Sequence, residues 1–263
     1  MKPRLSLILM FATVTLNAAP VWRDDFNQSA GSAPDAAKWS FDLGANGWGN
    51  AELEDYTASR ENSFIADDPA ATDGKALVIR AVRDGQGRYT SARLKTQGKY
   101  SVKYGRIEAR MRLPFGQGIW PAFWMLGESI SKIGWPKCGE IDIMEVPGHE
   151  PAKLHGTLHG PGYSADKGIS KSTTLRNAAK LSDGYHVYAV DWTPGRIAWS
   201  LDGVEYHVVT PEKLPSGANW VFDDGPFFIL LNLAVGGHWP GYPDATTQFP
   251  QELRVDYVRV YKL

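Results

Sequence analysis

The segment GRIEARMRL, residues 105–113, alternates apolar and charged side chains almost without a break. Its apolar positions are Ile107, Ala109, Met111 and Leu113. Because successive side chains of a β-strand point to opposite faces, this period of two predicts a strand with one face in the core.

The same kind of pattern recurs along the chain. Runs rich in β-branched and aromatic residues predict strands over 76–82, 186–192, 227–235 and 253–263. Residues 196–209 read as two strands joined at Asp202-Gly203, which is a strong hairpin signal. No segment shows sustained helical periodicity, and Gly and Pro clusters separate the strands. We therefore expect one all-β domain, built as a sandwich of antiparallel strands.

The first residues have the pattern of a secretory signal peptide. Lys2 and Arg4 precede an apolar run that extends to about Val14, and small residues follow. This run is short for a membrane span, although an uncleaved anchor helix is the alternative. We expect cleavage after Ala18, a signal peptide of residues 1–18, a single domain of residues 19–263, and a secreted or periplasmic protein.

Charge and cysteine content exclude several other classes. Without Lys2 and Arg4, the 28 basic residues become 26, against 29 acidic residues, which gives a net charge of −3. Such a weak charge does not suggest nucleic acid or an anionic membrane as a partner. The single cysteine, Cys138, cannot form an internal disulfide, and we expect it to be a buried packing residue. We expect a monomer that needs no organic cofactor.

The segment GEIDIMEVPG, residues 139–148, holds three acids: Glu140, Asp142 and Glu145. In a regular strand Glu145 would face away from the other two. An extra residue inserted at Ile143-Met144, as a β-bulge, would bring all three carboxylates to one face and turn Met144 away from it.

Two glutamates on one strand face could lie about 5–6 Å apart, the separation used by retaining glycosidases. That chemistry needs one ionised carboxylate to attack and one protonated carboxyl to donate a proton. Asp142 between them would hold a proton or hydrogen bond that couples their titrations. The alternatives are a solvent-facing acidic strand or a calcium site. The latter fits poorly because Ile and Met stand between the acids.

GEIDIME resembles the active-site strand of glycoside hydrolase family 16, in the laminarinase (endo-1,3-β-glucanase) branch that has the extra methionine. Residues 47–57, 91–127, 155–160, 232–241 and 255–261 are also similar to family motifs. The resemblance covers nearly all of residues 19–263. It implies a β-jelly-roll of two curved antiparallel sheets with a concave sugar-binding cleft. It further implies a retaining mechanism on β-glucan, with Glu140 as nucleophile, Glu145 as acid/base and Asp142 bonded to the nucleophile.

The resemblance also implies a set of sugar-binding residues. These are Asn50, Arg93, Trp120, Trp124, Trp135, His159 and Trp239. Spacing alone puts Trp120 and Trp124 on one strand face, where they could equally be core residues. Trp135 could instead pack in the core, and His159 could be a hydrogen-bonded core residue. The two histidines of HGTLHG, residues 155–160, do not suggest a zinc site, because such a site needs a helix and a third ligand near by. Asn232 lies in an apolar strand and must find a partner if it is buried.

A structural calcium ion is a further implication of the resemblance. The corresponding ligands would be Asp25, a carbonyl near Gly74, and Asp256. Asp25 stands where relatives more often have Glu, so this position departs from the family pattern.

Three other functions are compatible with the same motifs. Related enzymes cleave mixed-linkage β-1,3-1,4-glucan or a galactan such as agar. A non-catalytic glucan-recognition module has the same scaffold but would have lost the acids, which are present here. A transglycosylase would differ only in whether a sugar displaces water at the intermediate.

Overall fold

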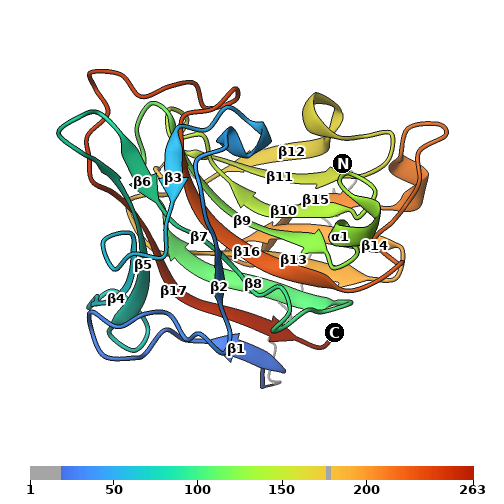
Figure 1. The fold of residues 1–263 in the computed structure, drawn as a ribbon. Coiled ribbons are helices and arrows are strands. Elements are labelled where there is room, and N and C mark those ends of the chain that lie inside the picture. Colours follow the sequence, from blue (N-terminus) through green and yellow to red (C-terminus); the bar gives the residue numbers. More distant parts are fainter. Residues whose placement is uncertain (1–18, 176–178) are drawn as a thin grey trace, which may run out of the picture.

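A computed structural model describes residues 19–175 and 179–263. The predicted signal peptide, residues 1–18, lies outside these ranges. The described residues form two curved β-sheets that stack face to face (Figure 1). The first strand, β1 (Trp22–Asp24), pairs with the last, β17 (Gln251–Tyr261), so the two ends of the described chain lie side by side.

One sheet has seven strands. Their spatial order is β12 (Ile169–Thr174), β11 (Lys153–His159), β10 (Glu140–Glu145), β9 (Ile119–Gly127), β16 (Phe227–Val235), β7 (Arg93–Lys95) and β2 (Ser40–Asp42). The strand β10 that carries the three acids is therefore near the middle of the sheet, between β9 and β11.

The other sheet has ten strands. Its main path is β15 (Val204–Val209), β14 (Arg196–Leu201), β13 (His186–Thr193), β8 (Gly105–Arg112), β17, β5 (Lys75–Arg83), β6 (Tyr89–Ser91) and β3 (Glu54–Tyr56), with β1 on β17 and β4 (Ser63–Asp67) on β5. Strands β3 and β6 run parallel, whereas the other pairs are antiparallel. The described helices are short: α1 (Ile130–Ile133), η1 (Gly47–Gly49), η2 (Ala165–Lys167) and η4 (Pro211–Lys213).

The core lies between the two sheets. Ile107 and Met111 of β8 are fully buried there with Phe123 and Met125 of β9 and Ile141 of β10. Burial of these side chains is the main source of stability, because apolar area removed from water contributes about 25 cal/mol per Å². The opposite face of the seven-stranded sheet is left free, and the acids of β10 lie on it.

The strand predictions are confirmed. Of the predicted residues 105–113, residues 105–112 form β8, and the apolar positions including Leu113 are buried. The Asp202-Gly203 turn joins β14 to β15, and both residues have positive φ, 49° and 77°, as a tight hairpin turn requires. Cys138 is buried as expected, and burial raises the pKa of its thiol to about 11. No helix in residues 19–175 or 179–263 is long and apolar enough to span a membrane.

Candidate active site

The predicted bulge is present in β10. The pairing with β9 slips between Asp142 and Met144, and the pairing with β11 slips between Asp142 and Glu145. Met144 is fully buried in the core, next to Ile143, whereas Glu140 and Glu145 are both partly exposed on the other face. The bulge thus returns Glu145 to the face of the other two acids, which confirms the prediction.

Trp199 of β14 ties this bulge to the opposite sheet. Its indole Nε1 donates a hydrogen bond of 2.7 Å to the backbone carbonyl of Asp142. His207 stacks on the indole with a centroid distance of 4.7 Å. Gly156 of β11 makes room for it, because a Cβ there would lie 2.5 Å from Trp199 Cδ1. The sequence analysis missed this role, since nothing in AWSL separates a bulge partner from an ordinary core aromatic.

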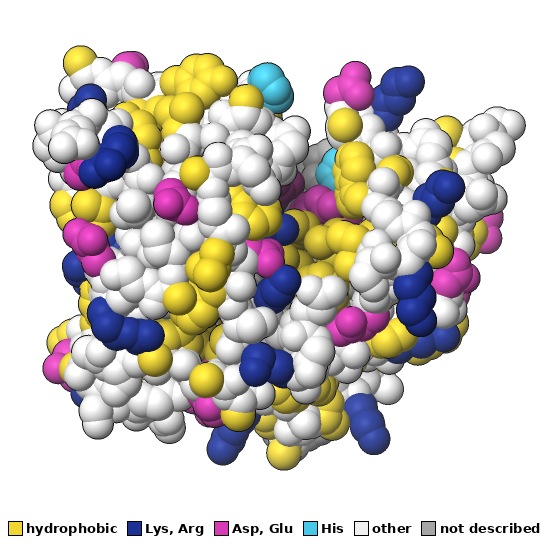
Figure 2. Space-filling model, in the orientation of Figure 1, with side chains coloured by type: hydrophobic (Ala, Val, Ile, Leu, Met, Phe, Trp, Pro, Cys, Tyr) yellow, Lys and Arg dark blue, Asp and Glu magenta, His cyan; other side chains and the backbone are white. Residues whose placement is uncertain are grey.

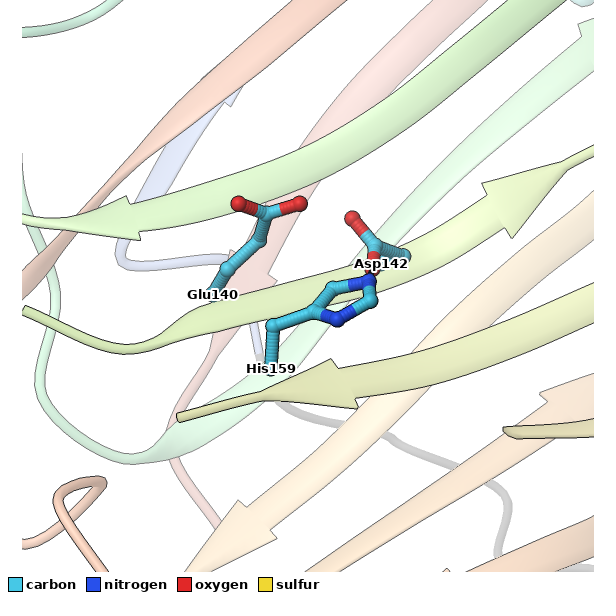
Figure 3. A group of neighbouring side chains, drawn as sticks. All are labelled: Glu140, Asp142 and His159. Atoms are coloured by element: carbon cyan, nitrogen blue, oxygen red, sulfur yellow. Dashed lines mark ion pairs between the residues drawn. The ribbon is translucent and has the colours of Figure 1, made fainter. Parts of the chain in front are cut away.

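Glu140, Asp142 and His159 form the centre of the site (Figure 3). Glu140 and Asp142 come from β10, and His159 comes from the adjacent position of β11. His159 Nε2 lies 3.2 Å from Asp142 Oδ2. The register partner of His159 on β10 is Glu140, and the charge of His159 also acts on Glu145, lowering its pKa.

Trp135 closes the site beside Glu140. Its indole Nε1 donates a 2.6 Å hydrogen bond to Glu140 Oε2, and its ring lies 6.1 Å from the ring of His159. The Trp135 side chain is 45% exposed. Trp135 therefore belongs to the site and not to the core, which decides between the two roles left open by its sequence.

Burial dominates the electrostatics of the three acids. It raises the pKa of Glu140 to about 8 and that of Asp142 to about 7, and the charge of Asp142 adds to the effect on Glu140. The pKa of Glu145 also lies well above its ordinary value, first because of burial and then because of the charge of Asp142. Burial and the charge of Asp142 thus both oppose ionisation of Glu140 and Glu145, which favours retention of a proton in the cluster.

Glu145 lies against an aromatic wall. Trp120 of β9 donates a 3.2 Å hydrogen bond from Nε1 to Glu145 Oε1. Trp239 packs edge-on against Trp120, at 5.5 Å between ring centroids, and against His155, at 5.0 Å. His155 is the register partner of Glu145 on β11, and it was absent from the residues we expected in the site. The alternation of HGTLHG, which puts His155 on the face of His159, was the signal for it.

A second wall lies beyond β9. Arg93 of β7 stacks between the rings of Trp48 and Trp124, 4.8 and 4.7 Å from their centroids, and forms an ion pair of 3.0 Å with Asp42. Trp124 Nε1 donates to the side chain of Asn232 at 2.7 Å, so this buried asparagine has the partner we expected. Trp48 was not among the predicted site residues.

Asn50 borders the same wall. Its Nδ2 donates to Glu52 Oε1 at 3.0 Å, and its carbonyl accepts from the backbone N–H of His238 at 2.9 Å. The predicted site residues are thus gathered on one side of the seven-stranded sheet.

Figure 2 shows a deep cleft between two raised parts of the surface, with hydrophobic, acidic and histidine side chains inside it.

The residues predicted to bind calcium have other partners. Arg259 and Arg23 pair with Asp25, at 2.8 and 3.2 Å. Arg110 pairs with Asp256, which also accepts hydrogen bonds from Thr72.

The carbonyl of Gly74 accepts from the N–H of Asp68 at 2.9 Å. Arginine at both carboxylates supplies the positive charge that an ion would bring, so this arrangement does not fit calcium. Among the described residues, Glu140, Asp142 and His159 form the group of three or more His, Cys, Asp or Glu side chains whose ligand atoms lie within 4.8 Å of one another.

Comparison with known proteins agrees with this geometry. The family model described as "Glycosyl hydrolases family 16" matches residues 55–259. The chain is 43% identical to a "Beta-glucanase" of Rhodothermus marinus over 252 residues, which is 92% of this chain and 84% of that protein.

Two solved structures are similar over most of their length. The laminarinase catalytic domain of Thermotoga maritima MSB8 is 45% identical, with a TM-score of 0.82, and the match covers 93% of this chain and 98% of that one. The endo-β-1,3-glucanase of Pyrococcus furiosus is 47% identical, with a TM-score of 0.82, and the match covers 92% and 94% of the two chains. The predicted jelly-roll fold is confirmed.

Proposed function

The chain belongs to the glycosyl hydrolases of family 16, and we propose that it is a retaining endo-β-1,3-glucanase that cleaves laminarin-type glucans. The observation that carries this proposal is the bulged strand β10, which turns Glu140, Asp142 and Glu145 to the cleft side of the sheet. The names of the similar proteins support β-1,3-glucan as the substrate over the mixed-linkage glucan and the galactan that the motifs also allow.

The first step of the proposed mechanism forms a covalent sugar ester. A carboxylate oxygen of Glu140 bonds to the anomeric carbon while the bond from that carbon to the leaving oxygen breaks. Glu145 gives its proton to the leaving oxygen, which departs as a sugar hydroxyl. The raised pKa of Glu145 suits this task, because a general acid must still hold its proton at the working pH.

The second step hydrolyses the ester. Glu145, now ionised, takes a proton from water, and the water oxygen attacks the anomeric carbon as the bond to Glu140 breaks. Two inversions at one carbon retain the β configuration. A sugar hydroxyl in place of water would give transglycosylation by the same route.

Asp142 keeps the proton that Glu140 must not hold. Trp135 already donates to Glu140, which favours the ionised form of that carboxylate. The mechanism needs the shared proton on Asp142 at the moment of attack, although burial and the charge of Asp142 raise the pKa of Glu140 above that of Asp142. The hydrogen bond from Trp135 opposes that rise, and His159 contacts Asp142 from the other side. The exposed rings of Trp135 and Trp239 offer flat apolar faces to the C–H groups of the sugar.

Localisation, oligomeric state and cofactor requirement complete the proposal. We propose a secreted or periplasmic monomer; the signal-peptide pattern of the N-terminal residues supports the secretion. Its chemistry uses carboxyl groups alone and draws on no organic cofactor.

The test is hydrolysis by the purified protein, measured as reducing ends released from laminarin, from mixed-linkage β-glucan and from agarose. We expect release from laminarin at the highest rate, with a series of short oligosaccharides as early products, because an endo-enzyme cuts internal bonds. Release from agarose alone would contradict the substrate but keep the mechanism. A laminarin-binding protein with no release from any of the three polymers would overturn the enzyme assignment.

The hydrogen bond from Trp135 predicts a shift in pH dependence. The indole N–H favours ionised Glu140, so the substitution Trp135→Phe raises the pKa of that carboxyl. Because attack needs ionised Glu140, activity is lost as the pH falls through this pKa. We expect the acid limb of kcat/KM to move to higher pH by about half to one unit. Trp239→Phe, which removes a cleft indole without contact to Glu140, is the control, and an acid limb that stays in place in Trp135→Phe would contradict the assignment.

A further inference from the structure

A second pair of buried glutamates lies outside the catalytic cluster. Glu52 is 9% exposed and Glu54 is fully buried. The Oε2 atom of Glu54 accepts a 2.6 Å hydrogen bond from the N–H of Val235, whereas its Oε1 atom is buried without a donor. Burial, followed by the charge of Glu52, raises the pKa of Glu54 well above its ordinary value. Glu54 therefore bonds the backbone of β16, whereas both oxygens of Glu52 accept from side chains.

A chain of hydrogen bonds connects Glu52 to the cleft. Tyr56 donates from its hydroxyl to Glu52 Oε2 at 3.0 Å. The same hydroxyl accepts from Asn232 Nδ2 at 3.1 Å, and Asn232 Oδ1 accepts from Trp124 Nε1 at 2.7 Å. Every donor in this chain points toward Glu52, so one carboxylate oxygen is the final acceptor of three bonds that run in the same direction.

The same carboxylate holds a second cleft residue. Glu52 Oε1 accepts from Asn50 Nδ2 at 3.0 Å, so each of its oxygens is used once. Burial and the two glutamates raise the pKa of Tyr56, which keeps its hydroxyl protonated and able to donate. Tyr56 is 1% exposed and touches no solvent that could replace these bonds.

The far end of the chain is the indole of Trp124, a cleft-facing side chain of β9. The guanidinium of Arg93 lies 4.7 Å from its ring centroid. Its N–H is held by Asn232 at 2.7 Å. With one contact on the ring face and one at the ring edge, both the tilt and the rotation of the indole are defined.

We propose that Glu52 and Tyr56 are positioning residues that hold Trp124 and Asn50 in the orientation that binds the sugar chain. Neither needs to touch the substrate: Glu52 acts as the fixed acceptor, and Tyr56 transmits its position through Asn232. This proposal rests on the proposed function, because it assigns the residues a purpose in binding a glucan. It differs from a role in folding alone in that it predicts a defect in substrate binding at temperatures where the fold is intact.

The test uses Tyr56→Phe, which removes one hydroxyl and keeps the ring. We expect KM for laminarin to rise by about two- to tenfold, the range of one lost hydrogen bond, with kcat changed by less than about twofold. Tyr188→Phe is the matched control, because Tyr188 is also fully buried but lies in the core between the sheets. An unchanged KM in Tyr56→Phe, or an equal rise in both variants, would overturn the proposal.

A double-mutant cycle with Trp124→Ala shows whether the effect passes through Trp124. If Tyr56 acts by orienting the indole, Tyr56→Phe leaves KM nearly unchanged once the indole has been removed. A rise by the same factor in both backgrounds would show that Tyr56 affects binding by another route. Wild-type protein that does not hydrolyse laminarin would instead contradict the proposed function, so the two failures are distinguishable.

Discussion

Substitution of Glu140 by alanine is expected to lower the rate of laminarin hydrolysis by at least about 10⁴-fold, because the variant has no group to form the sugar ester. The substitution also leaves a cavity where the carboxylate stood, on the face of the sugar opposite to the leaving oxygen. Sodium azide can enter such a cavity and attack the anomeric carbon of a substrate with an activated leaving group. We therefore expect azide to restore turnover of an aryl β-laminaribioside and to give the α-glycosyl azide.

The configuration of the product makes this result specific. One inversion by azide, in place of two by Glu140 and water, converts a β substrate to an α product. The anomeric coupling constant in a proton NMR spectrum of the product distinguishes the two. Glu212→Ala, at an exposed glutamate of η4, is the control and should keep wild-type kinetics. A Glu140→Ala variant with more than a few per cent of the laminarin activity would rule out Glu140 as the nucleophile.

The strand positions and the acidic site were predictable because their signals are local. The alternation in β8 and the Asp202-Gly203 turn are properties of a few neighbouring residues, and the structure has both as expected. The bulge in β10 followed from one requirement, that Glu145 share the face of Glu140. In each of these cases the side chains of a short segment favour one backbone conformation over the alternatives.

The contacts that complete the site depend on residues far apart in the sequence. Trp199 reaches Asp142 from the opposite sheet, and its role depends on space left by Gly156. The pair of Glu52 and Tyr56 is visible in the sequence, but its link to Trp124 runs through Asn232 and exists only when the fold brings β3 next to β16.

The calcium prediction shows that matching residues alone do not predict a binding site. The matching acid positions are present, but arginines pair with them. Arg23 stands two residues before Asp25, whereas Arg259 reaches Asp25 and Arg110 reaches Asp256 only because the fold brings their strands together.

Substitution of Glu145 by alanine is expected to separate the two steps of the reaction. Without a proton donor the natural leaving group departs as an unstabilised alkoxide, so hydrolysis of laminarin should fall by about 10²- to 10⁴-fold. A dinitrophenyl leaving group needs no proton, and with this substrate the first step should remain fast. The ester on Glu140 then accumulates, which appears as a burst of dinitrophenol followed by slow turnover.

Azide and pH give independent checks on this assignment. Azide attacks the ester from the side that Glu145 has vacated, so two inversions should yield the β-glycosyl azide, opposite to the product of Glu140→Ala. In the wild type, activity should fall as the pH rises through the raised pKa of Glu145, because the acid loses its proton. The alanine variant has no such group, so the release of dinitrophenol in the burst should lose that alkaline limb. An α-glycosyl azide from Glu145→Ala, or an unchanged alkaline limb, would mean that another residue is the general acid.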